Sequence, residues 1–223
     1  MSATIRDVAR AAGVSTPTVS RVLAKKENVN PLLRQRVLDA VRTLNYRPHR
    51  AARALRSQVS RSIAFIIPDI QNPFFTSVLR GVENAAFAND YVVLLCNTDD
   101  SFDRQQAYVE VLRAENVAGM VICPADEVRT FAQVETAKQE HTAIVAVDRL
   151  VQAAEIDTVM SDNVQGAQEA VRYLLDLGHT RIGIIAGPEY FAPGRERLLG
   201  FEHAHAEAGR LVAPELVKRT DFR

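Results

Sequence analysis

TIRDVARAAGVSTPTVSRVLA, residues 4–24, predicts two short helices joined by a tight turn, and the rest of the chain is organised around this stretch. Thr4 has the side-chain oxygen that an N-cap needs, and Asp7 three residues later completes a capping box. The apolar residues that follow share one helical face, and they are Ile5, Val8, Ala9 and Ala12. Gly13 stands where a helix most easily ends in a left-handed residue, and Ser15 is the N-cap of a second helix.

The second helix has an apolar inner face and a small, polar and cationic outer face. Its inner stripe consists of Val19, Val22 and Leu23. Its leading end and outer face carry Ser15, Thr16, Pro17, Thr18, Ser20 and Arg21. Small side chains allow a helix to sit deep in the major groove of DNA, and an arginine can bond guanine through two hydrogen bonds. Helix pairs with a glycine turn also occur in proteins of other functions, so an ordinary amphipathic pair remains the alternative.

The distribution of charge favours DNA binding over that alternative. Residues 1–61 hold 13 of the 27 Lys and Arg residues but only 3 of the 27 Asp and Glu residues, a net charge of +10. The remainder is therefore net −10, and a whole-chain charge of zero conceals a cationic head on an anionic body. This asymmetry is typical of a nucleic-acid-binding module attached to a sensing module.

A third helix is predicted after a polar loop at residues 25–29. Asn30 followed by Pro31 marks its start, and residues 45–48 mark its end. Its apolar face consists of Leu33, Val37, Ala40, Val41 and Leu44. The three helices together would form an all-α helix-turn-helix head with a very small core.

The next segment, HRAARALRSQVSRS at residues 49–62, has helix propensity but nothing obvious to bury against. An isolated helix this short is marginal in water, so the segment is expected to be disordered until a partner orders it. One interpretation is a plain solvated linker. The other is a hinge on DNA, in which phosphates neutralise Arg50, Arg53 and Arg56 and Leu55 enters the minor groove as an apolar wedge.

Length and composition indicate a globular chain without a membrane span. The chain has 223 residues, 47% of them hydrophobic, which is enough for one small module and a substantial α/β core. It contains no apolar run of about 18 residues and no apolar leader, so the cytoplasm is the default location and no membrane partner is expected. Cys96 and Cys123 lie in apolar runs without a CxxC motif or nearby histidines, so we interpret both as reduced core residues. No metal or cofactor is expected.

From Ser62 onward, continuous apolar runs alternate with amphipathic helices. The predicted strands lie near residues 62–67, 91–96, 117–123, 143–147, 157–160 and 181–186. The predicted helices lie near residues 74–88, 103–115, 128–139, 163–177 and 194–209. Strands that are apolar throughout are buried on both faces, so the expected fold is a parallel sheet flanked by helices.

The loops after these strands are rich in Asp, Asn, Arg and aromatic residues. Ligands of such sheets bind beyond the carboxyl ends of the strands. The relevant loops are residues 69–75, 97–100, 124–126, 148–149, 162–163 and 187–197. Carboxylates and amides accept hydrogen bonds from hydroxyl groups, and a phenyl face covers an apolar ring surface. The loops therefore suit a small polyhydroxylated or heterocyclic ligand.

Taken in order, the motifs resemble those of the lactose-repressor (LacI/GalR) family of transcription regulators. They include TIRDVARAAGVSTPTVSRVL, LNYRPHRAARALR, SIAFIIPDIQNPFF, VAGMVICPA, SDNVQGAQEAVRYLLDLGH and RIGIIAGP. The resemblance covers essentially the whole chain. It implies a periplasmic-binding-protein-like effector domain, a homodimer on a near-palindromic double-stranded DNA operator, and control by a small-molecule effector. It also implies a hinge that folds into a helix only on the operator, with Leu55 at the position of the wedging leucine.

Residue patterns and the resemblance together give two sets of candidate site residues. The DNA-binding candidates are Ile5, Arg6, Ser15, Thr16, Pro17, Thr18, Ser20, Arg21, Asn28, Arg53, Leu55 and Arg56. By resemblance, the effector-binding candidates are Phe74, Phe75, Asp148, Asp162 and Arg197. Some have alternative roles: one of the two phenylalanines could belong to the helix core, Asp148 could cap a helix, and Asp162 could belong to a crossover. Arg195 is expected to point elsewhere.

The expected domains are a helix-turn-helix domain at residues 1–48, a hinge at 49–61, and an α/β effector-binding domain at 62–223. The last would hold a first lobe near 62–161 and part of a second lobe, 162–223. The expected function is sequence-specific regulation of transcription, as a repressor. An enzyme is the weaker alternative, because no GxGxxG, GxxxxGK[ST] or GxSxG motif occurs and the five histidines have no evident partner. A ligand-binding module that has lost effector control is the other alternative.

Two departures from the family pattern refine these expectations. The segment PEYFAPGRER carries Phe191 and Pro193 where purine-sensing relatives use polar contacts, so a sugar or sugar acid is expected rather than a purine. Family members normally continue beyond the position of Arg223, so the second lobe is expected to be incomplete. A fragment, a truncated product or a partial sequence would each leave open sheet edges and uncovered apolar faces.

Overall fold

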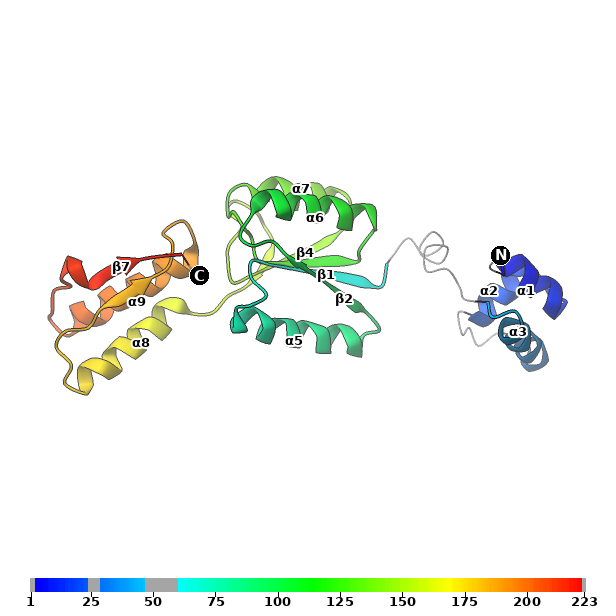
Figure 1. The fold of residues 1–223 in the computed structure, drawn as a ribbon, viewed down its shortest axis with the longest axis horizontal. Coiled ribbons are helices and arrows are strands. Elements are labelled where there is room, and N and C mark those ends of the chain that lie inside the picture. The colour runs from blue at the N-terminus through cyan, green and yellow to red at the C-terminus, as the bar shows by residue number, and fades with distance from the viewer. Residues whose placement is uncertain (1–2, 24–28, 47–59, 222–223) are drawn as a thin grey trace. The chain divides into compact units, whose positions relative to one another are not determined.

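The computed structural model describes residues 3–23, 29–46 and 60–221. The chain divides into two compact units, with the division between residues 58 and 59. In the described residues the first unit is helical and the second combines helices with parallel strands (Figure 1). Four of the predicted DNA-binding residues lie outside the described residues, namely Asn28, Arg53, Leu55 and Arg56.

The described part of the first unit contains α1 (Ile5–Ala12), α2 (Thr16–Leu23) and α3 (Pro31–Thr43). The predicted capping box is present, because the Asp7 N–H donates to the Thr4 hydroxyl and the Thr4 N–H donates to the Asp7 carboxylate at 3.0 Å. Gly13 follows α1 with a φ of 62°, in the left-handed region that favours glycine. The Ser15 hydroxyl accepts from the Thr18 N–H at 3.4 Å, as expected of the N-cap of α2.

A small apolar core holds these three helices together. Its buried members are Val8, Ala9, Ala12, Val19, Val22, Val37 and Ala40. Leu33 was expected in this core but is only half-buried and lies outside it, because the buried part of α3 begins one turn later at Val37. Leu38, which the apolar stripe did not include, packs against the core instead.

A five-stranded parallel sheet forms the centre of the second unit. Its strands are β1 (Ser62–Ile67), β2 (Val92–Asn97), β3 (Gly119–Ile122), β4 (Ala143–Val147) and β5 (Asp157–Val159). Their spatial order is β2-β1-β3-β4-β5, so the chain reverses direction across the sheet between β2 and β3. Polar loops that follow β1, β2 and β4 therefore lie at one edge of the sheet, where α/β proteins place ligands.

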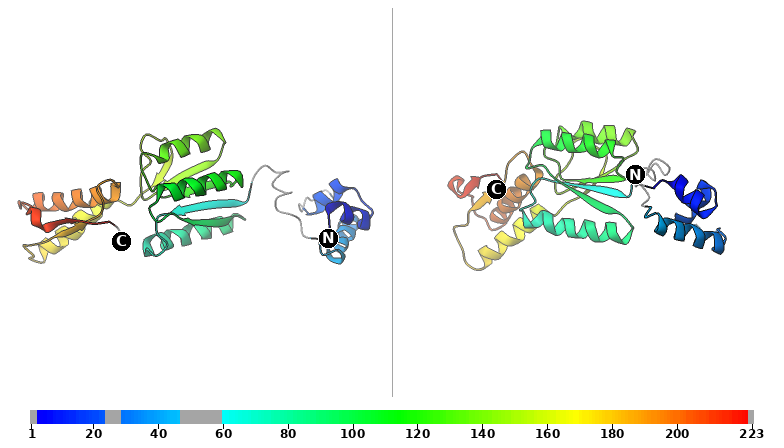
Figure 2. Two further views of the ribbon diagram at one scale, coloured as in Figure 1. Left: turned by 45° about the horizontal axis from the view of Figure 1, so that its top comes forward. Right: turned by 45° about the vertical axis from the view of Figure 1, so that its right-hand side comes forward.

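Helices cover both faces of this sheet. Helix α5 (Pro73–Ala88) lies on one face, and α6 (Phe102–Ala114) and α7 (Thr130–Gln139) lie on the other, as the views in Figures 1 and 2 agree. Phe65 and Ile67 of β1 pack on the α5 side. Ala64 and Ile66 alternate with them and pack against α6 and α7. Burial of β1 on both faces confirms the fold class expected from its continuous apolar sequence.

A second, smaller lobe follows β5. It contains α8 (Asn163–Asp176), β6 (Ile184–Ala186), α9 (Ala192–Glu207), a short 3-10 helix (Pro214–Leu216) and β7 (Val217–Arg219). Strands β6 and β7 pair in parallel, and α8 packs against α9 around Val171 and Phe201. Gly200 permits this close packing, because a Cβ there would collide with the carbonyl oxygen of Val164.

The helices and strands predicted between residues 62 and 209 are all present, with shifts at their ends. Helix α9 begins at Ala192 rather than at 194, because Pro193 fits the first turn of a helix. Strand β6 is shorter than the predicted strand, and the pairing of β6 with β7 was not predicted. Among the residues that the structure describes, no helix is long and apolar enough to span a bilayer.

Candidate functional site

The first candidate site is the outer face of α2 with the start of α1. Arg6, Pro17 and Arg21 are exposed, and Thr16, Thr18 and Ser20 are half-buried. The hydroxyl groups of Ser15 and Thr18 lie 2.9 Å apart and share a hydrogen bond at the start of α2. Ile5 packs partly against the helical core. The predicted residues Ser15, Thr16, Pro17, Thr18, Ser20 and Arg21 thus lie together at the start and on the outer side of α2, each at least partly exposed.

The capping box also fixes the charge at the start of α1. Hydrogen bonds from the Thr4 hydroxyl and the Thr4 N–H lower the pKa of Asp7, and the nearby Arg10 acts in the same direction. Asp7 therefore stays ionised at neutral pH. Its negative charge is favourable at the N-terminus of a helix, so the capping box stabilises the start of α1.

The second candidate site is a cavity at the carboxyl ends of β1, β2 and β4. It has a volume of about 190 Å³. Its lining residues are Pro68, Asp69, Asn72, Phe74, Phe75, Asp100, Asp148, Arg149, Pro193 and Arg197. Both lobes contribute to it, because Pro193 and Arg197 come from α9 and the others follow strands of the five-stranded sheet.

Four of the five predicted effector-binding residues line this cavity. Phe75 is 4% exposed and packs in the core beneath α5, whereas Phe74 is 39% exposed. Phe74 therefore offers more ring surface to a ligand than Phe75 does. Asp162 is the exception: it is absent from the cavity lining, and its carboxylate accepts from the Gln165 N–H at 2.9 Å as the N-cap of α8.

Asp148 occupies a special backbone position directly after β4. Its φ is 66°, in the left-handed region, and its N–H donates to the Val159 carbonyl oxygen at 2.9 Å. Burial raises the pKa of its carboxyl group, and the guanidinium groups of Arg149 and Arg197 oppose that rise. A buried carboxylate in a strained conformation is costly to stability and is typical of ligand-binding sites.

Arg197 projects from α9 and is held by the second lobe. Its Nε donates to the Asn163 Oδ1 at 2.9 Å. The Asn163 amide in turn donates to the Glu196 carboxylate at 3.0 Å. Arg195 points elsewhere, as expected, because it donates to the Glu189 carbonyl oxygen and lies 3.4 Å from the Glu127 carboxylate.

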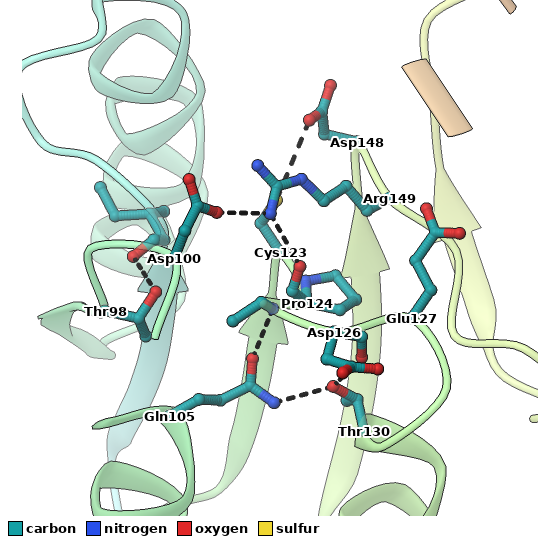
Figure 3. Close-up of polar contacts among 12 residues, drawn as sticks. Thr98, Asp100, Gln105, Cys123, Pro124, Asp126, Glu127, Thr130, Asp148 and Arg149 are labelled. Carbon is teal, nitrogen blue, oxygen red and sulfur yellow. Dashed lines mark hydrogen bonds and ion pairs between the residues drawn. The ribbon is translucent and has the colours of Figure 1, made fainter. Parts of the chain in front are cut away.

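Arg149 belongs to the predicted loop 148–149 but was not among the candidate effector-binding residues. It is 2% exposed, and its guanidinium donates to the Asp100 carboxylate at 2.6 Å and to the Pro124 carbonyl oxygen at 3.0 Å (Figure 3). The guanidinium carbon also lies 3.5 Å from the centre of the Phe191 ring. Arg149 therefore joins the loops after β2, β3 and β4 to the start of α9.

Burial determines the protonation state of the two cysteines. Burial raises the pKa of both the Cys96 and Cys123 thiols, so both are protonated at neutral pH. The Cys123 thiol lies 3.9 Å from the Asp148 carboxylate. Within residues 3–23, 29–46 and 60–221, no group of three or more His, Cys, Asp and Glu side chains is arranged to hold a metal ion.

Similarity to known families covers both units. Residues 4–49 match the family of bacterial regulatory proteins called the lacI family. Residues 60–221 match the family described as periplasmic binding proteins and sugar binding domain of the LacI family.

Individual relatives agree with these matches. The repressor PurR of Aliivibrio fischeri strain MJ11 is 34% identical over 99% of this chain and 65% of its own length. The ribose operon repressor of Halalkalibacterium halodurans is 39% identical over 92% of this chain and 60% of its own length. The lac repressor dimer bound to operator superposes with a TM-score of 0.83 at 23% identity, over 100% of this chain and 66% of that chain, which shows a shared fold. The chain spans about 65% of the length of the PurR relatives it matches.

The fold and the sites define a class of protein: a helix-turn-helix head joined to a periplasmic-binding-protein-like α/β body. Since the family match to the body alone spans residues 60–221, the assignment covers most of the chain. The chain belongs to the LacI family. The named relatives are transcriptional repressors and not enzymes, so the enzyme alternative has no support among them.

Proposed function

We propose that this chain is part or all of a sequence-specific transcriptional repressor controlled by a small-molecule effector. The observation that carries the proposal is the joining of a positively charged helix-turn-helix unit to an α/β unit with a polar cavity. The helix-turn-helix unit contacts DNA, and the cavity binds the effector that controls this contact. The proposed domains are residues 1–48, 49–61 and 62–223.

On DNA, we assign base reading to α2. Arg21 and Pro17 are exposed on this helix, and the small side chains beside them allow the backbone to approach the floor of the major groove. Arg6 is exposed at the start of α1, where it can contact a phosphate. In the hinge, Arg53, Leu55 and Arg56 remain proposed contacts that lie outside the described residues.

For the effector, we propose a neutral sugar. Three carboxylates (Asp69, Asp100, Asp148) and two guanidinium groups (Arg149, Arg197) line the cavity, and Arg149 is already bonded to Asp100. The carboxylates suit hydroxyl donors, whereas a ligand carboxylate would add to the excess negative charge. Phe74 can cover the apolar face of a ring. The sugar-binding description of the matched family and the ribose operon repressor relative agree with this choice.

The proposed active form is a homodimer. Strand β2 is an edge strand of the described sheet, and its Leu94 and Leu95 side chains are exposed. Phe87, near the end of the adjacent α5, is 85% exposed. Exposed apolar residues beside the outer edge of a sheet favour association between copies. Two heads related by two-fold symmetry would read the two halves of a near-palindromic operator.

Effector control is tested by measuring the affinity of the chain for a duplex, selected beforehand from a random pool, in the presence of each of four small-molecule probes. The probes are D-ribose, cellobiose, D-gluconate and a purine base, and the affinity of the 223-residue chain for the duplex is measured by fluorescence anisotropy. The proposal predicts a change of at least about fivefold with one neutral sugar, the lower end of typical coupling between sites. Unchanged DNA affinity with every probe would favour a module that binds DNA without effector control.

A further inference from the structure

Helix α9 begins without a cap from its own sequence. Its N-cap residue, Phe191, has no side-chain hydrogen bond to offer, and Pro193 in the first turn has no N–H. The N–H groups of Gly194 and Arg195 both donate to the Phe191 carbonyl oxygen. In this first turn, the Ala192 N–H therefore has no acceptor within the helix. A buried N–H group of this kind needs a hydrogen-bond partner from elsewhere.

The partner comes from the other lobe. Glu127, in the loop between β3 and α7, accepts from the Ala192 N–H at 2.8 Å through its Oε1. Its Oε2 lies 3.4 Å from the Arg195 guanidinium. Glu127 is 3% exposed, and 65 residues separate it from Ala192 in the sequence. By contrast, α8 in the same lobe is capped locally by Asp162.

The loop that carries Glu127 is held in place by buried hydrogen bonds. Gln105 of α6 is fully buried, its Oε1 accepts from the Ala125 N–H at 2.7 Å, and its Nε2 donates to the Thr130 hydroxyl at 2.8 Å (Figure 3). The Thr130 hydroxyl donates to the Asp126 carbonyl oxygen at 2.6 Å. The backbone carbonyl of Glu127 accepts from the Gln152 N–H at 2.7 Å. The Glu127 carboxylate is therefore presented by a fixed loop of the first lobe.

The capped turn of α9 also carries the second-lobe side of the cavity. Pro193 and Arg197 line the cavity, one residue and five residues after Ala192. Any shift of the start of α9 away from the first lobe would move both side chains away from Asp148. The position of Arg197 thus depends on a contact that forms only when the two lobes are docked.

We propose that Glu127 is a positioning residue of the effector cavity, which caps α9 across the lobe boundary and so couples lobe docking to the placement of Arg197. The inference rests on the proposed function for what the cavity binds, whereas the cap itself is independent of any ligand. Docking of the lobes completes the helix, and completion of the helix sets Arg197 opposite Asp148. Burying the Glu127 carboxylate and the Ala192 N–H costs desolvation, which their hydrogen bond and the ion pair with Arg195 offset only in this arrangement, so the contact selects one docked geometry.

Hydrogen exchange of the Ala192 amide in the full chain tests the cap directly and needs neither DNA nor effector. Glu127→Ala is expected to raise its exchange rate at least tenfold, with amides of β1 and β3 unchanged. Glu127→Gln keeps an acceptor oxygen and is expected to retain most of the protection. An unchanged Ala192 rate in Glu127→Ala, equal loss in both variants, or a uniform rise across both lobes would overturn the proposal.

A distance measurement tests the coupling to lobe docking and keeps the proposal falsifiable if Glu127→Ala folds poorly. Spin labels at Glu83→Cys on α5 and Glu169→Cys on α8 report the separation of the lobes, with labelling of the unmodified chain as the background. With Glu127→Gln, the distances between the two spin labels are expected to form one narrow distribution. With Glu127→Ala, longer distances between the labels are expected to appear as well.

Asp162→Ala is the matched control, since it removes a local cap from α8 and is expected to leave the lobe separation unchanged. A distribution that Glu127→Ala leaves unchanged, or that Asp162→Ala broadens equally, would overturn the proposal. Because no ligand is used, either result is independent of whether the cavity binds a sugar.

Discussion

Arg149 and Asp100 form an ion pair of 2.6 Å in which the arginine side chain is 2% exposed and the aspartate 29%. The pair joins the loop after β4 to the loop after β2, and the Phe191 ring covers the guanidinium from the second lobe. The cost of desolvating an arginine is offset only if its partners are well placed. The cavity is therefore built around the Arg149 guanidinium, which is held by the loops after β2, β3 and β4.

Replacing Arg149 by methionine should destabilise the α/β unit, because it leaves the Asp100 carboxylate partly buried without its partner. The expected loss is about 2 to 3 kcal/mol in the free energy of unfolding, measured by urea denaturation. Arg104→Met is the control, because the Arg104–Asp99 pair is exposed, and it should cost less than about 1 kcal/mol. Equal losses in the two variants would contradict the role given to Arg149.

Asp148→Asn should stabilise the folded chain at neutral pH while it weakens effector binding. Burial raises the folded-state pKa of Asp148 above its ordinary value of 3.8, so the folded state holds this proton more tightly than the unfolded state. The contribution of the group to stability is therefore fully present below pH 3.8 and is lost as pH rises through the folded pKa.

The test is the difference in unfolding free energy between Asp148→Asn and the original chain, measured from below pH 3.8 up to neutral pH. The stabilisation by Asp148→Asn should grow as pH rises above 3.8 and then level off. A difference in unfolding free energy that does not change with pH would show that burial does not raise the pKa of Asp148.

Arg197→Ala should weaken binding of the effector sugar by at least about tenfold, because a charged hydrogen-bond donor is lost from the cavity. Calorimetric titration with the sugar that changes DNA affinity provides the measurement. Arg172→Ala is a matched control in the same lobe, since Arg172 pairs with Glu207 at the surface. If both variants bind the sugar as the original chain does, Arg197 is not a ligand contact.

Arg21→Ala should relax base preference at one symmetric pair of operator positions and cost about 1 to 3 kcal/mol on the preferred sequence. Selection from a random duplex pool gives the consensus for each variant. Arg42→Ala serves as the comparison, because Arg42 lies on α3 and within 3.6 Å of Asp39. A consensus that Arg21→Ala leaves intact would remove Arg21 from base reading.

Phe87→Glu should shift the chain from dimer to monomer, because it places a charge in the exposed apolar surface beside β2. Sedimentation equilibrium at several concentrations measures the change. Tyr173→Glu is the control, since Tyr173 is also exposed but lies on α8. A dimer that survives Phe87→Glu, or dissociates equally with Tyr173→Glu, would place the contact elsewhere.

The features that follow local rules were predictable from the sequence. The capping box of Thr4 and Asp7, the left-handed Gly13 and the buried strand β1 each depend on a few neighbouring residues, and the structure confirms all three. Asp148 directly follows β4, at the edge where parallel sheets bind ligands, and its effector-binding role was predicted from the family resemblance.

Other features depend on contacts between distant segments and were not predictable. Nothing near Arg149 in the sequence indicates that it would form an ion pair with Asp100, 49 residues away. The cap that Glu127 gives to α9 is equally remote, because the local sequence of α9 shows only that its own cap is missing. Asp162 caps α8 and is absent from the cavity lining, so its contact with the effector stays a prediction.

The proposed repressor function depends above all on the reading of duplex DNA by the cationic head. Its most direct test is the affinity of the 223-residue chain for a selected near-palindromic duplex against random duplex at moderate salt. A preference of at least about a thousandfold for the selected duplex is expected, the lower end for specific DNA-binding proteins. Equal affinity for the selected and random duplexes would contradict it.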